Sequence, residues 1–400
     1  MKKRVLMSLL TSSVMFAGGY KIPEVSTNGV ALGAANVAHV HSADAAYYNP
    51  ANMVFMEDKQ NIEADLIYIG LDSVHYDGKV QNDDTTYSID SEKETFIIPN
   101  LHYVSPKLGE NDVRIGISVV VPGGLSKRWS DQPAKVRAQE FTLEVVELNP
   151  TLAIPIGDKV AFAFGFRIVS TSGVVKSSGN IGRDMTGDSV DMGYNLALAY
   201  KPTKKLEFGA TYRSRVNLTV TGTAKLYDPT GLVYDGGANV TVPLPAFATL
   251  AAAYTFDTQT TIEVLYERNM WSAYQTLDFN YVGSVGNLAP YFDEPHAKDW
   301  KDTNTYRVGL TQELDKWTVM AGFVKDETPV PDSSLSFELP GTDTISVSMG
   351  TRYQYNDSIN IGFSALYSMH DERTVDNEDL SGTFSDGNVL IVSVGLGYRF

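Results

Sequence analysis

The amino-acid sequence predicts an all-β protein, a transmembrane antiparallel β-barrel of about 14 strands with an N-terminal plug in its lumen. Three observations lead to this prediction: a short apolar leader, long segments in which apolar and polar residues alternate, and connections that alternate between short and long. The expected organisation is a signal peptide in residues 1–17, the plug in residues 18–56 and the barrel in residues 57–400.

The composition excludes several classes of protein. The formal net charge of −16 argues against nucleic acid as a partner. Beyond the leader, the chain has no apolar run long enough for a membrane-spanning helix, whereas the alternating strands of a barrel average out in hydropathy. The absence of Cys excludes disulfides, thiolate catalysis and Cys-type metal sites.

The leader has the pattern of a secretory signal peptide. Lys2, Lys3 and Arg4 form a positive region, Val5 to Phe16 is mostly apolar, and small residues follow from Ala17. Cleavage is expected after Ala17. The alternative is a short buried N-terminal helix.

The next segment, residues 18–56, is rich in Ala, Val, Gly and Asn and shows no strand alternation. Small residues let a backbone pack tightly within a lumen of limited width. The segment closes on Asn49-Pro50-Ala51, in which Pro50 fixes φ and Asn49 is able to bond locally in a turn. This motif is expected to hold the last turn of the plug.

Later segments alternate with a period of two. In residues 160–168 the odd-numbered positions are small or charged and the even-numbered ones are aromatic or aliphatic, as in Phe164, Gly165, Phe166 and Arg167. A water-soluble sandwich would turn the apolar face inward, whereas a membrane barrel would turn it toward lipid.

Connection lengths decide between these two structures, because a sandwich with Greek-key connections has no reason to alternate short with long. The expected short connections are 108–111, 156–158, 201–205, 256–259, 313–316 and 355–358. The expected long ones are 77–86, 122–140, 171–189, 222–243, 282–302, 328–342 and 371–387. This pattern is typical of outer-membrane barrels and places both chain ends on the periplasmic side.

Several short motifs, taken in order, resemble the FadL/TodX/OmpP1 family of outer-membrane transporters for long-chain fatty acids and other hydrophobic compounds. They include residues 44–52 (DAAYYNPAN), 148–153 (LNPTLA), 193–196 (GYNL), 244–246 (LPA), 299–303 (DWKDT) and 326–332 (DETPVPD). The family fold is a 14-stranded barrel with an N-terminal plug, in agreement with the strand count above.

The resemblance implies a passive channel in the outer membrane of a Gram-negative bacterium, without cofactor or catalysis. Loops would capture a fatty acid or another hydrophobic compound, the plug would rearrange, and the ligand would leave sideways through the wall. The expected partners are outer-membrane lipid, the hydrophobic ligand and the barrel-assembly machinery, which reads C-terminal signals similar to the final Phe400; the expected state is a monomer. The alternatives are a general porin for polar solutes, a channel of the same family specific for hydrocarbons or aromatic compounds, and an outer-membrane enzyme.

Seven further residues are candidates for parts of such a channel. Gly116, in the third strand, is a candidate for an inward kink, or else relieves crowding against the plug. Trp129, Val136 and Phe141 are candidates for a capturing loop, the alternative being a solvated loop. By alternation, Arg167, Arg213 and Arg215 are expected to face the lumen, where guanidinium groups bind carboxylates. A structural ladder with glutamates is favoured over contact with ligand.

Two motifs suggest chemistry and are set aside. His39 and His41 lack a third ligand, so no metal site is expected. The Gly187-Asp188-Ser189-Val190 segment resembles a hydrolase block but lies at a junction of loop and strand. No phosphate-binding loop is present, so nucleotide-driven transport is not supported.

Overall fold

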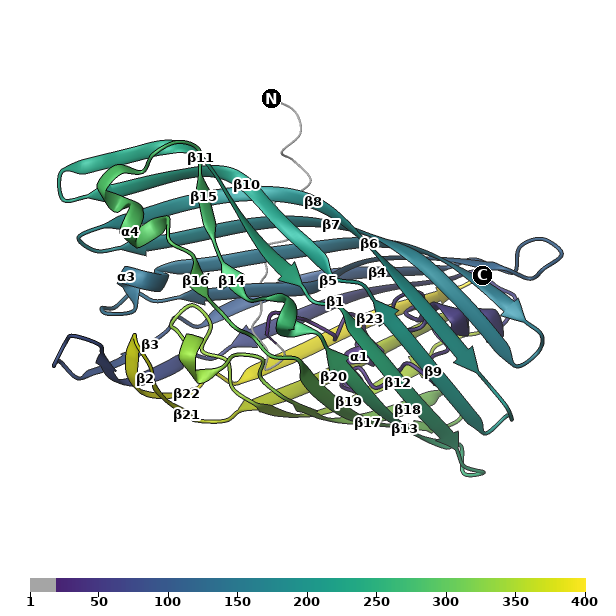
Figure 1. Ribbon diagram of the computed structural model, residues 1–400. Helices are drawn as coiled ribbons and strands as arrows, with labels where there is room; N and C mark the ends of the chain where they lie inside the picture. The colour runs from purple at the N-terminus through teal and green to yellow at the C-terminus, as the bar shows by residue number, and fades with distance from the viewer. Residues whose placement is uncertain (1–18) are drawn as a thin grey trace.

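The computed structural model describes residues 19–400, so the predicted signal peptide lies outside the described residues. One antiparallel sheet closes on itself to form a barrel (Figure 1). The first strand, β1 (Asn61–Leu71), pairs with β4 (Glu94–Val104) on one side and with the last strand, β23 (Val389–Arg399), on the other. Closure removes the free sheet edges that an open sheet would expose.

The sheet contains 17 strand segments, which build a wall of 14 strands. The difference arises because three wall strands are each split into two segments: β9 with β10, β11 with β12, and β13 with β15. Between β4 and β23 the segments are β5 (Arg114–Arg128), β6 (Glu140–Ile156), β7 (Val160–Ser178), β8 (Gly182–Tyr200), β9 (Leu206–Arg213), β10 (Val216–Asp228), β11 (Gly231–Leu244), β12 (Phe247–Thr255), β13 (Thr260–Asn269), β15 (Phe279–Tyr281), β17 (Thr303–Glu313), β18 (Trp317–Asp326), β19 (Thr344–Gln354) and β20 (Ile359–His370).

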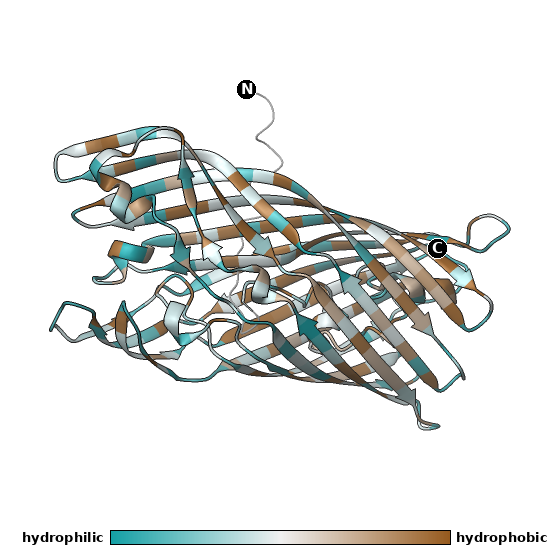
Figure 2. Cartoon of the chain, viewed as in Figure 1, coloured by the Kyte–Doolittle hydropathy of each residue, from teal (hydrophilic) through white to brown (hydrophobic). Residues whose placement is uncertain are grey.

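The apolar face of the wall points outward. On β7, Phe166 is 63% exposed, whereas the next residue, Arg167, is 1% exposed and faces the lumen. Figure 2 shows the resulting alternation of apolar and polar residues along the wall strands. An outward apolar face is the arrangement of a barrel in lipid, which confirms the predicted fold class and excludes the sandwich.

Short connections and Phe400 lie at one end of the barrel, and most of the longer excursions lie at the other (Figure 1). Two connections that were predicted to be long are tight hairpins: β7 runs to Ser178 before β8 begins at Gly182, and β10 runs to Asp228 before β11 begins at Gly231. The strands remain paired through both regions. Their Ser, Thr and Gly residues weaken the alternation, so the sequence pattern ends before the strands do.

The remaining connections cover the end of the barrel with small elements. A four-stranded sheet has the order β21 (Arg373–Asp376), β22 (Leu380–Asp386), β2 (Val74–Val80) and β3 (Tyr87–Asp90). The other elements are α3 (Lys135–Ala138), η2 (Trp271–Ala273), β14 (Thr276–Leu277), η3 (Gly286–Leu288), α4 (Ala289–Phe292), β16 (His296–Ala297) and η4 (Asp332–Ser334). Among residues 19–400, no helix has the length and apolar character needed to cross a membrane.

Residues 19–56, here called the N-terminal segment, lie inside the barrel (Figure 1). They form α1 (Thr27–Ala31), α2 (Ala45–Tyr48) and η1 (Pro50–Phe55). Ser26 begins α1 as its N-cap, because its hydroxyl accepts a hydrogen bond from the Gly29 N–H at 2.9 Å. Because the three helices are short, the chain changes direction several times within the lumen.

The N-terminal segment packs against glycines of the wall. A Cβ atom at Gly209 would lie 2.5 Å from the carbonyl oxygen of Val37, and one at Gly322 would lie 2.4 Å from the carbonyl carbon of Leu32. These distances are too short for a residue with a side chain. The backbone of the N-terminal segment therefore approaches the wall this closely only because the wall residues are glycines. Similar contacts occur at Gly309, Gly350, Gly362 and Gly395.

Candidate functional site

An apolar pocket lies inside the barrel, toward the end that carries the longer connections. The empty space among its side chains amounts to ≈ 700 Å³, including the part that opens to solvent. The lining comes from the wall and from the covering connections, and its apolar members include Leu125, Phe141, Leu143, Val175, Met185, Val220, Val240, Val242, Leu277, Phe279, Trp300 and Leu339.

One charged pair borders this apolar surface. Lys298 is 7% exposed, and its ammonium group donates a hydrogen bond to Glu338 Oε1 at 3.1 Å. Burial by itself would raise the pKa of the Glu338 carboxyl, but the charge of Lys298 and the hydrogen bonds to the carboxylate together outweigh burial and lower this pKa to about 2. Glu338 therefore stays ionised at neutral pH and holds the cation at the pocket wall.

Tyr20 forms the floor of the pocket. Its ring packs edge-on against Trp271 at 4.8 Å between centroids and lies 5.9 Å from Trp300. The next residue, Lys21, points to the opposite side, where its ammonium group pairs with Glu267 and donates to Asn269 Oδ1 at 2.8 Å. The start of the N-terminal segment thus separates an apolar space from a polar layer.

The third wall strand, β5, bends where it meets this floor. Its register with β6 shifts between Val120 and Gly123. The Ile22 N–H donates to the Pro122 carbonyl at 2.9 Å, and the Gly124 N–H donates to the Tyr20 carbonyl at 2.8 Å. Proline removes a ladder donor and glycine tolerates close backbone approach, so the local sequence favours a bulge here.

The ladder between β4 and β5 is interrupted at this bend, and the interruption is here called the gap. Within residues 19–400, the ladder between these strands covers four residue pairs, from Leu101–Val119 to Val104–Gly116. Beyond it, a side chain bridges the strands, because Asn100 Oδ1 accepts a hydrogen bond from the Val121 N–H at 3.2 Å. After the bend, β5 contributes Leu125 to the pocket, so the gap and the pocket share one strand.

The predicted kink residue, Gly116, lies before this bend. It pairs regularly with Val104 on β4 and with Thr151 on β6, so the irregularity falls further along the strand than predicted. A Cβ at Gly116 would lie 2.8 Å from Ala46 Cβ and 2.7 Å from Met53 Sδ. The structure therefore fits the alternative interpretation, in which Gly116 relieves crowding against the N-terminal segment.

The three predicted capture residues lie in different surroundings. Phe141 lines the pocket. Trp129 is buried among the covering connections, where its Nε1–H donates to the Phe337 carbonyl at 2.9 Å. Val136, on α3, is 38% exposed. The three residues therefore form no single surface, because β5 continues to Arg128 and carries Trp129 into a loop core.

Two of the predicted lumen cations belong to a wall network. Arg167 Nε donates to Glu147 Oε2 at 2.9 Å, and Arg213 pairs with the other oxygen of the same carboxylate. In contrast to the prediction, Arg215 is exposed. The wall strand breaks between β9 and β10 at Ser214, which is buried directly after Arg213, so the alternation shifts by one residue.

The Asn49-Pro50-Ala51 motif lies where η1 begins. Asn49 Oδ1 accepts a hydrogen bond from the Ala51 N–H at 3.2 Å, and Pro50 occupies the first turn. Asn49 Nδ2 donates to the Val37 carbonyl at 2.8 Å and to the Leu198 carbonyl of β8 at 3.2 Å. The motif therefore joins two parts of the N-terminal segment to each other and to the wall.

Lys298, Glu338 and Tyr20 were not singled out from the sequence. Lys298 and Glu338 lie in irregular connections, where neither period two nor a helical period assigns a side chain to a face. The only available signal was the similarity of neighbouring residues 299–303 to a family motif.

The comparisons agree on one group of proteins. A family model described as "Outer membrane protein transport protein (OMPP1/FadL/TodX)" matches residues 8–400. A long-chain fatty acid transport protein of Escherichia coli O6:H1 is 24% identical, covering 98% of this chain and 96% of the relative. A Pseudomonas aeruginosa FadL homologue superposes with a TM-score of 0.83 at 19% identity, covering 95% and 99% of the two chains. The Pseudomonas putida toluene transporter TodX superposes with a TM-score of 0.72 at 16% identity, covering 93% and 97%.

Proposed function

Because the chain belongs to the OMPP1/FadL/TodX family of outer membrane transport proteins, we propose that it binds hydrophobic molecules in the apolar pocket and releases them sideways into the membrane. The observation that carries this proposal is the position of the pocket. It lies beside a gap in the wall and above a lumen half that the N-terminal segment fills.

The pocket favours apolar ligands because binding removes apolar surface of both partners from water. A sideways exit keeps such a ligand out of the aqueous space at the end with the short connections. The filled lower half also speaks against a general porin, which needs an open aqueous lumen. No chemical step is part of this proposal.

We further propose that the ligand is a long-chain fatty acid. Among the described residues that line the pocket, Lys298 is the only cation. A fatty-acid carboxylate would exchange for Glu338 at this ammonium group while the alkyl chain occupies the apolar space. An aromatic hydrocarbon has no group that uses Lys298, so the charged pair favours the fatty acid over the hydrocarbon-specific channel of the same family.

The outer surface, the closure of the sheet and the C-terminal residue suggest the partners of the barrel. Outward apolar side chains such as Phe166, Leu250 and Phe363 would contact outer-membrane lipid. Since the sheet closes within one chain, the proposed working unit is a monomer. Phe400 directly follows the strand that closes the barrel and is proposed as the signal that the barrel-assembly machinery reads.

Equilibrium binding of palmitate, 1-hexadecanol and toluene to the purified barrel tests the ligand class. Palmitate should bind more tightly than the alcohol, and Lys298→Met should remove most of that preference, by about fivefold to tenfold for one charge-assisted hydrogen bond. Lys93→Met is the control, because Lys93 pairs with Asp72 at the exposed surface. Toluene binding without palmitate binding would indicate the hydrocarbon channel instead. Binding of none of the three compounds would remove the pocket as the ligand site.

A further inference from the structure

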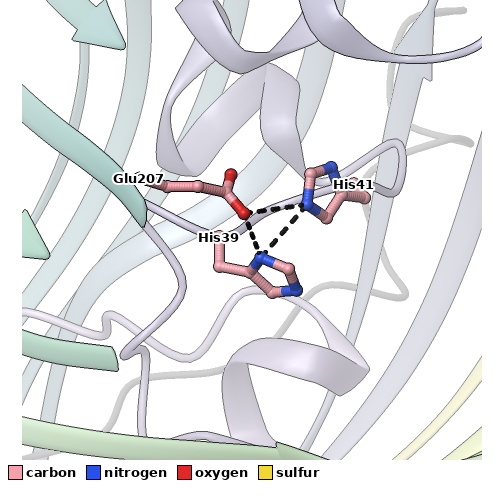
Figure 3. Close-up of side chains that lie close together, drawn as sticks. All are labelled: His39, His41 and Glu207. Carbon is pink, nitrogen blue, oxygen red and sulfur yellow. Dashed lines mark hydrogen bonds and ion pairs between the residues drawn. The ribbon is translucent and has the colours of Figure 1, made fainter. Parts of the chain in front are cut away.

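Two histidines of the N-terminal segment and one glutamate of the wall converge near the end of the barrel with the short connections (Figure 3). His39 Nδ1 lies 2.6 Å from Glu207 Oε1. His41 Nε2 lies 3.2 Å from His39 Nδ1 and 3.7 Å from Glu207 Oε1. From the sequence, the histidines lacked a third ligand; strand β9 supplies it from 168 residues away.

The three atoms have the spacing of metal ligands. In a tetrahedral zinc site, nitrogen and oxygen ligands lie about 2.0–2.1 Å from the ion and therefore roughly 3.3–3.4 Å from one another. The observed separations fall on both sides of this value, so small side-chain rotations would place an ion between them. Two His and one Glu form a donor set found in zinc sites that keep a fourth position for water.

The lone pairs of this cluster also suit a cation. Without a metal, the close approach of His39 Nδ1 to Glu207 Oε1 and to His41 Nε2 requires a proton on at least one of the two ring nitrogens. A divalent ion instead accepts a lone pair from each of the three atoms. The two imidazole rings are edge-to-face, with centroids 4.4 Å apart, and the three ligand atoms lie within 4.8 Å of one another.

The backbone that carries His39 is held before any ion binds. The N–H groups of Val37, Ala38 and His39 donate to the Glu263 carboxylate at 2.7, 2.9 and 2.9 Å. Asn49 of the Asn-Pro-Ala motif holds the same stretch through the Val37 carbonyl. Fixed ligands lose less conformational entropy on binding, which raises affinity.

The cluster is accessible and its charge is balanced. The His41 side chain is 45% exposed and the Glu207 side chain 7%, so an ion has a path from solvent to a shielded carboxylate. Lys201 pairs with the second oxygen of Glu207, Oε2, and leaves Oε1 to the histidines. This ammonium group lowers metal affinity by charge repulsion without blocking the site.

We propose that His39, His41 and Glu207 bind one divalent transition-metal ion, with zinc the best match, and that the ion fastens the N-terminal segment to β9. Two ligands come from the segment and one from the wall, so the ion forms a link that the segment must break in order to move. The site is independent of the transported ligand, and its test requires none.

Titration of Zn²⁺ into the metal-stripped barrel, in detergent and followed by calorimetry, tests the proposal. One equivalent should bind, and His41→Ala or Glu207→Gln should each lower the affinity at least about tenfold. Lys201→Met should raise the affinity, because it removes the opposing charge. The control is His75→Ala, since His75 pairs with Asp90 in the covering sheet, away from the cluster.

Hydrogen exchange provides a second measurement that does not depend on the number of ions bound. Zn²⁺ should slow exchange in residues 36–42 of the wild-type chain and leave it unchanged in His41→Ala. Equal affinity in His41→Ala, Glu207→Gln and the His75→Ala control would overturn the proposal, as would the absence of a stoichiometric site in the wild-type chain. Binding that is retained without any change in exchange would show that the ion does not fasten the segment.

Discussion

The two halves of the lumen differ in what fills them. Toward the longer connections, apolar side chains line a pocket with one charged pair at its edge. Toward the short connections, the N-terminal segment fills the lumen, and buried charges meet in pairs such as Lys21 with Glu267 and Arg352 with Glu63. The difference supports the proposal that ligand binding and sealing of the lumen belong to separate layers, with Tyr20 at the boundary between them.

The largest expected effect comes from breaking the polar layer. Glu267→Ala leaves Lys21 and Arg307 buried without their shared carboxylate, which costs about 3–5 kcal/mol in the free energy of unfolding. It should also release the start of the N-terminal segment, so single-channel conductance in planar bilayers should rise. The control Asp257→Ala removes an exposed ion pair and should leave stability and conductance close to the wild-type values. Unchanged stability and conductance in Glu267→Ala would mean that this layer does not seal the lumen.

A smaller effect is expected at the motif that joins the N-terminal segment to the wall. Asn49→Ala removes hydrogen bonds to Val37, Leu198 and Ala51, and should weaken docking of the segment by about 2 kcal/mol. Uptake should change while the heat-modifiable folded barrel persists on gels. Asn356→Ala is the matched control, because Asn356 holds a turn at a short connection. If the folded band disappears in Asn49→Ala, the motif serves barrel assembly instead.

The smallest of these effects concerns the apolar layer alone. Phe141→Ala removes an aromatic ring from the pocket and should lower palmitate affinity about tenfold, which corresponds to about 1.4 kcal/mol of lost apolar contact. Phe166→Ala removes the same ring from the outer surface, where it is 63% exposed, and should leave the affinity unchanged. Equal losses in both variants would locate the ligand elsewhere.

The periodic part of the fold was predictable because each wall strand repeats one rule, apolar outward and polar inward. This rule gave wrong predictions where a strand is interrupted or bulged. Arg215 was assigned to the lumen by counting through Ser214, where the strand is interrupted. The bend of β5 was assigned to Gly116, although the sequence that favours a bulge, Pro122-Gly123-Gly124, follows it.

The site residues were less predictable, since they depend on contacts between distant parts of the chain. Glu207 completes the histidine cluster from 168 residues away, and Tyr20 reaches the pocket from the first described turn. Lys298 belongs to a connection without periodicity. A local sequence pattern does not predict contacts between residues that are far apart in the chain. The Asn49-Pro50-Ala51 turn, in contrast, is local and was recognised from its residues alone.

Closing the gap between β4 and β5 tests the sideways route most directly. The chain has no native Cys, so Asn100→Cys with Val121→Cys introduces one disulfide across the gap. Leu101→Cys with Val119→Cys introduces a control bridge within the existing ladder of the same strands. Fatty-acid uptake should stop when the Asn100→Cys/Val121→Cys disulfide forms and return when it is reduced, while this variant still binds palmitate. Uptake through the oxidised control variant should persist. Undiminished uptake through the oxidised Asn100→Cys/Val121→Cys barrel would contradict the account.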